Sequence, residues 1–128
     1  MEATPRPRAF KTAWFTNAAN KAKINEGALC KAIQQALLGQ VDDLGGGVYK
    51  KRLEINNYRS IILAKGGDFW IYSYLFAKKD RGNIDDGELS AFRDLAKIYA
   101  TMNGQQVDSQ ITDGHWIEIC KDKRESTL

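Results

Sequence analysis

A run of three glycines at 45–47 divides this chain into two halves with different hydrophobic patterns. Glycine is unfavourable in the interior of a helix, so we expect no helix to cross the run. Before it, apolar residues recur at helical spacing. After it come three segments rich in β-branched and aromatic residues, at 48–53, 58–64 and 69–77, with a turn signal at 66–68 before the last. The sequence therefore predicts helices first and then an antiparallel meander of three strands.

Two short helices, packed as an antiparallel pair, are predicted in the first half. Thr12 is suited to cap the first helix, whose buried apolar stripe would begin with Trp14. Asn25 is suited to cap the second helix, and Gly39 is well placed to end it. Residues 8–11 would form a short strand at the edge of the sheet.

Strict alternation in the segment 69–77 assigns its side chains to two faces of a strand. One face would carry Phe69, Ile71, Ser73, Leu75 and Ala77. The other face would carry Trp70, Tyr72, Tyr74 and Phe76. Both faces are largely apolar, which is typical of a central strand.

A third helix is predicted after the capping box at 85–88, and a last strand at 115–120. This order of elements predicts an α+β fold with a mainly antiparallel sheet, an N-terminal helix pair and a later third helix. A chain of 128 residues has room for one core of ordinary size. We therefore expect a single domain over 1–128, with flexible ends at about 1–8 and 122–128.

The positive charge of the chain is concentrated rather than large. Lys and Arg number 19 against 16 Asp and Glu, which gives a formal net charge of +3 and does not by itself indicate nucleic acid. Between Lys50 and Arg81, however, eight basic residues stand against three acidic ones. The N-terminus has no signal-peptide pattern and no segment approaches about 20 apolar residues, so we expect a cytoplasmic protein.

The cysteines and the single histidine do not form a recognisable metal site. Cys30 and Cys120 lie far apart in the sequence, and there is no CxxC motif. We expect two buried free thiols, no disulfide framework, no metal and no cofactor.

The basic residues form three clusters on consecutive predicted strands, at 50–52, at Arg59 and at 78–81. If the strands are adjacent, cations and aromatic rings converge on one surface, which suits single-stranded RNA. RNA cleavage there would need no cofactor, because the ribose 2′-OH can attack its own phosphate. Charges that only keep strand edges in solvent would give the same pattern. Phosphate-binding loops, GxSxG elbows, paired histidines and EF-hand loops are missing, which argues against serine or metal hydrolases.

Several motifs occur in a fixed order along the chain: DLGGGVYKKR at 43–52, YR at 58–59, FAKKDRGNI at 76–84 and EL at 88–89. In order and spacing they resemble a HigB/RelE-like branch of the RelE/ParE superfamily, the toxins of type II toxin-antitoxin systems. The similarity extends roughly over 10–120.

The resemblance implies a toxin that cuts mRNA in the ribosomal decoding site. It would be held inactive by a cognate antitoxin, often of the helix-turn-helix type. The residues that match the pattern and are candidates for catalysis are Lys50, Arg59, Lys78 and Arg81. The candidates for RNA binding are Lys51, Arg52, Lys79, Tyr58 and Tyr74. His115 and Glu54 are weaker candidates for acid-base roles, because neither falls on a motif position.

Two other functions remain open. A ParE-like toxin would block DNA gyrase with the same fold and without a phosphate clamp. A catalytically inactive remnant would serve as an antitoxin-binding module, and the segment 53–57 favours it. That segment is shorter and less basic than the glycine-rich loop typical of the branch.

Overall fold

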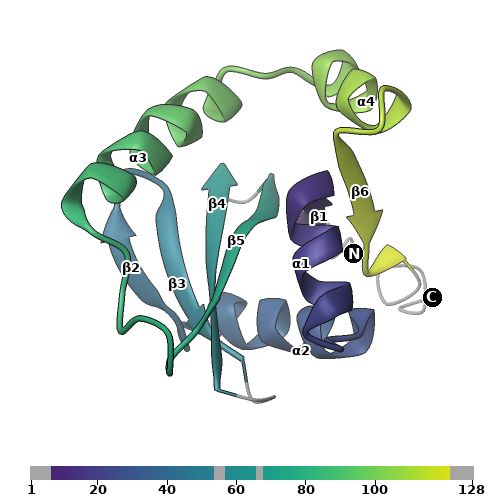
Figure 1. Cartoon of the computed structure of the whole chain (residues 1–128). Coiled ribbons are helices and arrows are strands. Elements are labelled where there is room, and N and C mark those ends of the chain that lie inside the picture. Colours follow the sequence, from purple (N-terminus) through teal and green to yellow (C-terminus); the bar gives the residue numbers. More distant parts are fainter. Residues whose placement is uncertain (1–6, 54–56, 66–67, 122–128) are drawn as a thin grey trace.

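The computed structural model describes residues 7–53, 57–65 and 68–121, which form a six-stranded sheet covered by helices on both faces (Figure 1). The spatial order of the strands is β2-β3-β4-β5-β1-β6. The strands are β1 (Arg8–Thr12), β2 (Asp42–Gly45), β3 (Val48–Arg52), β4 (Tyr58–Lys65), β5 (Phe69–Ala77) and β6 (Trp116–Ile119). The helices are α1 (Ala13–Lys21), α2 (Glu26–Leu37), α3 (Asp86–Ala100) and α4 (Gly104–Thr112). The α+β class with a mainly antiparallel sheet is confirmed.

The ends of the first helices follow the predicted caps. The side chains of Thr12 and Asn25 accept hydrogen bonds from the backbone of Phe15 and Ala28, and Gly39 follows α2 with a φ of 89°. Figure 1 draws α2 crossing the end of α1 rather than running along it, so the antiparallel arrangement that we expected is not found. Both helices pack their apolar sides on the same face of the sheet.

Strand β1 is not at the edge of the sheet, contrary to the sequence prediction. It pairs in parallel with β5 and antiparallel with β6. The position is held by Arg8, which forms two hydrogen bonds of 2.9 Å with Glu118. Because β6 comes from the other end of the chain, a local pattern could not reveal that it covers β1.

Two elements were not predicted. Strand β2 has the sequence DDLG, and Asp and Gly are rare in strands, so its pairing with β3 overrides a poor propensity. Helix α4 is mostly polar and buries only Val107 among its residues. Its sequence signal is the capping box formed by Asn103 and Gln106. Because the segment after Gly104 is polar, it was not predicted to be a helix.

A β-bulge in β5 changes which side chains share a face. Ile62 pairs with Tyr72, whereas the preceding Ile61 pairs with Tyr74, so Ser73 is an extra residue. Tyr72 therefore packs against α1 and α2, and Tyr74 lies on the opposite face with α3. The common face predicted for Trp70, Tyr72, Tyr74 and Phe76 was wrong, because strict alternation does not survive an inserted residue.

Cys30 and Cys120 form a disulfide, so the expectation of free thiols was wrong. The bond joins α2 to the residue that follows β6, and the two Cα atoms are 5.6 Å apart. A separation of 90 residues in the sequence concealed this proximity. The Glu26 carboxylate also accepts a hydrogen bond from the backbone of Cys120, so two contacts fix this junction.

Residues 1–6 and 122–128, at the ends that we expected to be flexible, and Glu54 lie outside the described residues. Among the described residues, no helix is both long and apolar enough to cross a membrane.

Candidate nucleic-acid interface

Two rows of side chains cross strands β3, β4 and β5 on the face that α3 partly covers. In one row Arg52 pairs with Arg59, which pairs with Phe76. In the next row Lys50 lies opposite Ile61, which lies opposite Tyr74. Residues directly opposite each other in antiparallel strands share a face, and residues two apart on one strand do too. The register thus brings together Lys50, Arg52, Arg59 and Tyr74, which are far apart in the sequence.

Helix α3 covers only the apolar part of this face. It packs over Val48, Ile61 and Leu63 through residues that include Ala96. The row that contains Arg52 and Arg59 lies at the other end of the strands, and Arg52 is exposed there. The basic row therefore borders the helix-covered core and remains accessible.

Arg59 is the most unusual residue of the row. It is partly buried, and its terminal nitrogen Nη1 is inaccessible to solvent without a hydrogen-bond partner. Its neighbour across the ladder is another cation, Arg52. A buried donor without a partner is unfavourable, and so are like charges on directly opposite strand residues. An anion bound near the two guanidinium groups would offset the repulsion between their charges.

The adjacent residues Lys50 and Lys51 point to opposite faces of the sheet. The Lys50 ammonium lies 3.9 Å from the Asp42 carboxylate on β2, at the accessible face. Lys51 is only 8% exposed, and its ammonium donates a 2.8 Å hydrogen bond to the carbonyl of Gln40 just after α2. The structure thus separates Lys51 from the basic row, and we leave it out of the proposed site.

Arg81 is held at the rim of the same face by an acidic partner. Its guanidinium forms two hydrogen bonds with Glu88, 3.0 and 2.5 Å long, and a weaker one with the Tyr74 hydroxyl at 3.4 Å. The same group lies 5.8 Å from the centre of the Phe76 ring. The bond to Glu88 raises the pKa of Arg81. The guanidinium of Arg81 and the backbone of Asp85 together lower the pKa of Glu88.

The remaining predicted residues lie around this arrangement. Lys78 and Lys79 are exposed in the turn that follows β5, where the backbone N–H of Lys78 donates to the carbonyl of Asn57. Tyr58 lies opposite Ala77 and packs on the α1–α2 side, so it does not share the face of Tyr74. His115 is exposed just before β6, two strands away from β5, and is not brought to the basic row.

Trp14 is a candidate that sequence reasoning missed. The apolar stripe of α1 predicted it to be buried, yet it is 52% exposed and its ring stacks on Tyr74 with centroids 5.1 Å apart. No sequence pattern indicated this contact, because the face on which Tyr74 lies depends on the bulge at Ser73.

Taken together, the face offers fixed cations and aromatic rings, and its clearest capability is to bind a phosphate and stabilise added negative charge on it.

A family model described as the RelE toxin of the RelE / RelB toxin-antitoxin system matches residues 7–119. No curated protein and no solved structure matches the chain. The HigB-like branch stays a prediction. Because the family model spans most of the sequence, the chain belongs to the RelE toxin family and is the toxin of a toxin-antitoxin system, with a cognate antitoxin as its partner.

Proposed function

We propose that this toxin is a ribosome-dependent endoribonuclease that cuts mRNA without a metal ion and so inhibits translation. The observation that carries the proposal is the cross-strand pair of Arg59 and the exposed Arg52. Such a pair is unfavourable by itself and favourable around a phosphate. Guanidinium groups bind phosphate oxygens with two parallel hydrogen bonds, which a lysine cannot do.

In the proposed reaction the 2′-oxygen of a ribose attacks the adjacent phosphorus, and the bond to the 5′-oxygen of the next nucleotide breaks. The products are a 2′,3′-cyclic phosphate and a free 5′-OH; the proton lost from the 2′-OH is balanced by the proton gained at the 5′-oxygen. Negative charge builds on the non-bridging oxygens during the attack. Arg59 and Arg52 would stabilise it, with Lys50 in the neighbouring row and Lys78 at the end of β5 adding positive potential.

Arg81 takes part in this proposal under the control of Glu88. A carboxylate that accepts two hydrogen bonds from Arg81 neutralises it in the free protein. An incoming phosphate must compete with Glu88 for the guanidinium, so Arg81 would bind substrate less tightly than Arg59 does. Lys79, exposed in the same turn, would add positive potential for the RNA backbone.

The proposal also covers the partners of the toxin and its location in the cell. The ribosome would present the mRNA, so the toxin would act in the cytoplasm. The antitoxin, proposed to be of the helix-turn-helix type, would cover the basic row with acidic side chains.

A test in bacteria separates this function from its competitors. The toxin, its Arg59→Met variant and a Lys97→Ala control, which removes an exposed charge from α3, are expressed from a tightly repressed promoter. Methionine incorporation should stop quickly with the wild type and the control, with new 5′ ends inside codons, and continue with Arg59→Met. A DNA-damage response with intact mRNA would indicate gyrase inhibition instead. Unaffected growth would indicate an inactive remnant.

A further inference from the structure

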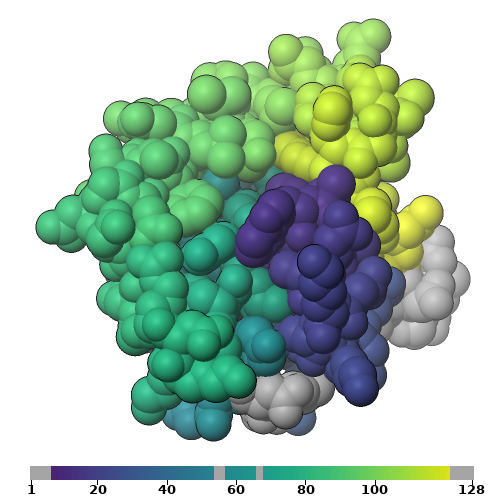
Figure 2. All heavy atoms as spheres, viewed as in Figure 1, coloured from purple at the N-terminus to yellow at the C-terminus, as the bar shows by residue number. Residues whose placement is uncertain are grey.

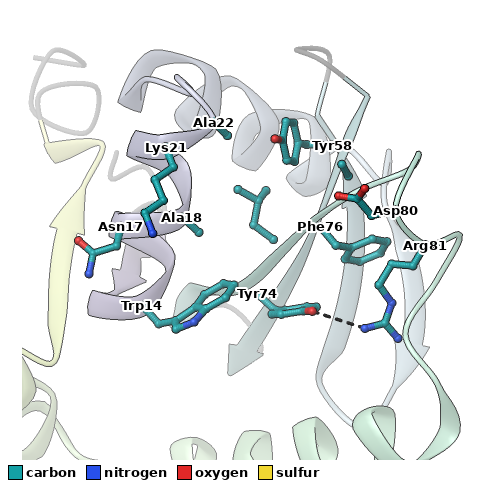
Figure 3. Close-up of a pocket in the computed structure, with 12 residues that line it drawn as sticks. Trp14, Asn17, Ala18, Lys21, Ala22, Tyr58, Tyr74, Phe76, Asp80 and Arg81 are labelled. Atoms are coloured by element: carbon teal, nitrogen blue, oxygen red, sulfur yellow. Dashed lines mark hydrogen bonds between the residues drawn. The ribbon is translucent and has the colours of Figure 1, made fainter.

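A groove runs between α1 and the second half of β5, beside the basic row. Its volume is about 560 Å³, within the range of small-molecule sites. Figure 2 shows it as a recessed strip of sheet between the purple atoms of α1 and the green atoms that follow β5. Its walls carry Trp14 and Lys21 from α1 and Arg81 from the segment after β5 (Figure 3).

The groove exists because β1 covers only the first half of the edge of β5. β1 pairs with Phe69 to Tyr72, and the chain then turns into α1. From Ser73 to Ala77, β5 pairs with β4 alone among the strands that the structure describes. The carbonyl of Ala77 faces this edge, where it accepts hydrogen bonds from the backbone N–H groups of the turn that follows. Backbone direction alternates along a strand, so the N–H and the carbonyl of Leu75 face the same edge. The floor of the groove thus offers a donor and an acceptor of the main chain.

Trp14 provides an aromatic platform at one end of the groove. It is 52% exposed, whereas Trp70 and Trp116 are 9% and 2% exposed. Its ring is fixed by Tyr74, and Tyr74 in turn lies 5.9 Å from Phe76. A large, rigid, exposed ring held in place from one side is the arrangement on which an unstacked base binds.

The polar groups around the groove suit a nucleotide better than an apolar ligand. Lys21 on one wall and Arg81 on the opposite wall are cations that phosphates on either side of a base could contact, although a phosphate must compete with Glu88 for Arg81. Asn17 and Asp80 offer an amide and a carboxylate that can bind the polar edge of a base. Phe76 belongs both to this groove and to the row of Arg52 and Arg59, so the two sites are continuous.

We propose that this groove is a nucleobase subsite, in which one unstacked base of the RNA strand stacks on Trp14 next to the phosphate held by Arg59. The inference rests on the proposed ribonuclease function and adds to it a residue that helps to select the cleavage site. Trp14 contacts the base, and the free edge of β5 with Asn17 and Asp80 reads its polar groups.

The test uses the intrinsic fluorescence of the purified protein and a short 2′-O-methyl RNA, which lacks the attacking hydroxyl and cannot be cut. Binding should quench the fluorescence of Trp14. Trp14→Leu should weaken binding about 5- to 150-fold, the range typical of losing one base-aromatic stack, and Trp14→Phe should restore most of it. An oligonucleotide of the same length with abasic sites should bind the wild type more weakly than the intact one does. Its affinity for the wild type should equal the affinity of the intact oligonucleotide for Trp14→Leu. Leu38→Ala, at a residue 77% exposed after α2, serves as the control for loss of an exposed apolar side chain.

Equal affinity of the wild type and Trp14→Leu, or equal affinity for intact and abasic oligonucleotides, would overturn the subsite. Cleavage of mRNA on ribosomes is measured separately with the same variants. Normal cleavage and unchanged cut sites in Trp14→Leu would refute the subsite and leave the proposed function intact. Stacking on Trp14 without any cleavage by the wild type would support the subsite and refute the proposed function.

Discussion

Arg59 lies directly opposite Arg52 on the neighbouring strand, with one of its terminal nitrogens buried and unpartnered. Opposed like charges destabilise a strand pair by about 0.2–1 kcal/mol, and an unsatisfied buried donor costs about 1–3 kcal/mol. The free protein therefore keeps an unfavourable arrangement, and an anion near the two guanidinium groups would offset the repulsion between them.

The first prediction is that Arg59→Met raises the free energy of unfolding by about 1 kcal/mol. Methionine keeps the apolar stem of the side chain and removes the charge and the unsatisfied donor. Guanidinium chloride unfolding measures the change. Inorganic phosphate, added at constant ionic strength, should stabilise the wild type more than the variant. A less stable variant, or equal stabilisation of both proteins by phosphate, would contradict this account of Arg59.

The neighbouring lysines should respond in opposite ways. Lys50→Met should slow RNA cleavage and leave the free energy of unfolding nearly unchanged, because methionine keeps the apolar stem and the 3.9 Å ion pair that is lost is with Asp42, whose side chain is 71% exposed. Lys51→Met should lower the free energy of unfolding by about 1–3 kcal/mol, because it removes a charged hydrogen bond to Gln40. Its cleavage rate per folded molecule should match that of the wild type. The two variants are each other's controls, and a slower cleavage in Lys51→Met would place that residue back in the site.

The pH dependence of stability should report the pair of Arg81 and Glu88. Arg81 lowers the pKa of Glu88 below its usual value of 4.5, so the contribution of the pair is complete above about pH 4.5. It is lost as the pH falls through the lowered pKa. Urea unfolding between about pH 3 and 7 should show a smaller loss of stability on acidification for Glu88→Gln than for the wild type. Parallel curves for the two proteins would mean that the pair makes no net contribution.

Glu88→Gln also tests the competition for Arg81. Removing the carboxylate leaves the guanidinium with a neutral partner, so the affinity for the 2′-O-methyl RNA at neutral pH should rise. A lower affinity would mean that Glu88 positions Arg81 for RNA instead of competing with it.

Reduction of the Cys30–Cys120 bond should destabilise the toxin by about 2–5 kcal/mol, because the bond closes a long loop in the unfolded chain. Guanidinium unfolding with and without a phosphine reductant measures this difference. The Cys30→Ser, Cys120→Ser double variant should unfold like the reduced protein and ignore the reductant. The difference bears on the proposed action in the cytoplasm, because thiols there are usually kept reduced. Identical midpoints for oxidised and reduced wild type would show that the bond does not stabilise the fold.

The sequence predicted the elements whose signals are local. The caps at Thr12, Asn25 and Asp85 were readable because a capping side chain and its backbone partner lie three residues apart. The meander was readable from its composition, and it was enough to bring Lys50, Arg52 and Arg59 to one face.

What the sequence could not predict depends on contacts between distant segments. The internal place of β1 depends on Glu118, and the disulfide depends on the meeting of α2 with the end of β6. The groove beside Trp14 depends on the bulge at Ser73, since one inserted residue moves Tyr74 to the other face. The clamp of Glu88 on Arg81 depends on how the turn after β5 enters α3.

The most direct test of the central claim measures mRNA cleavage on purified ribosomes by primer extension, with wild type, Arg59→Met and Lys97→Ala. We expect the wild type and Lys97→Ala to cut the mRNA in the decoding site only when ribosomes are present. Arg59→Met should be about 100- to 1,000-fold slower, the usual loss for one transition-state donor. Absence of cleavage by the wild type, or wild-type cleavage by Arg59→Met, would contradict the account.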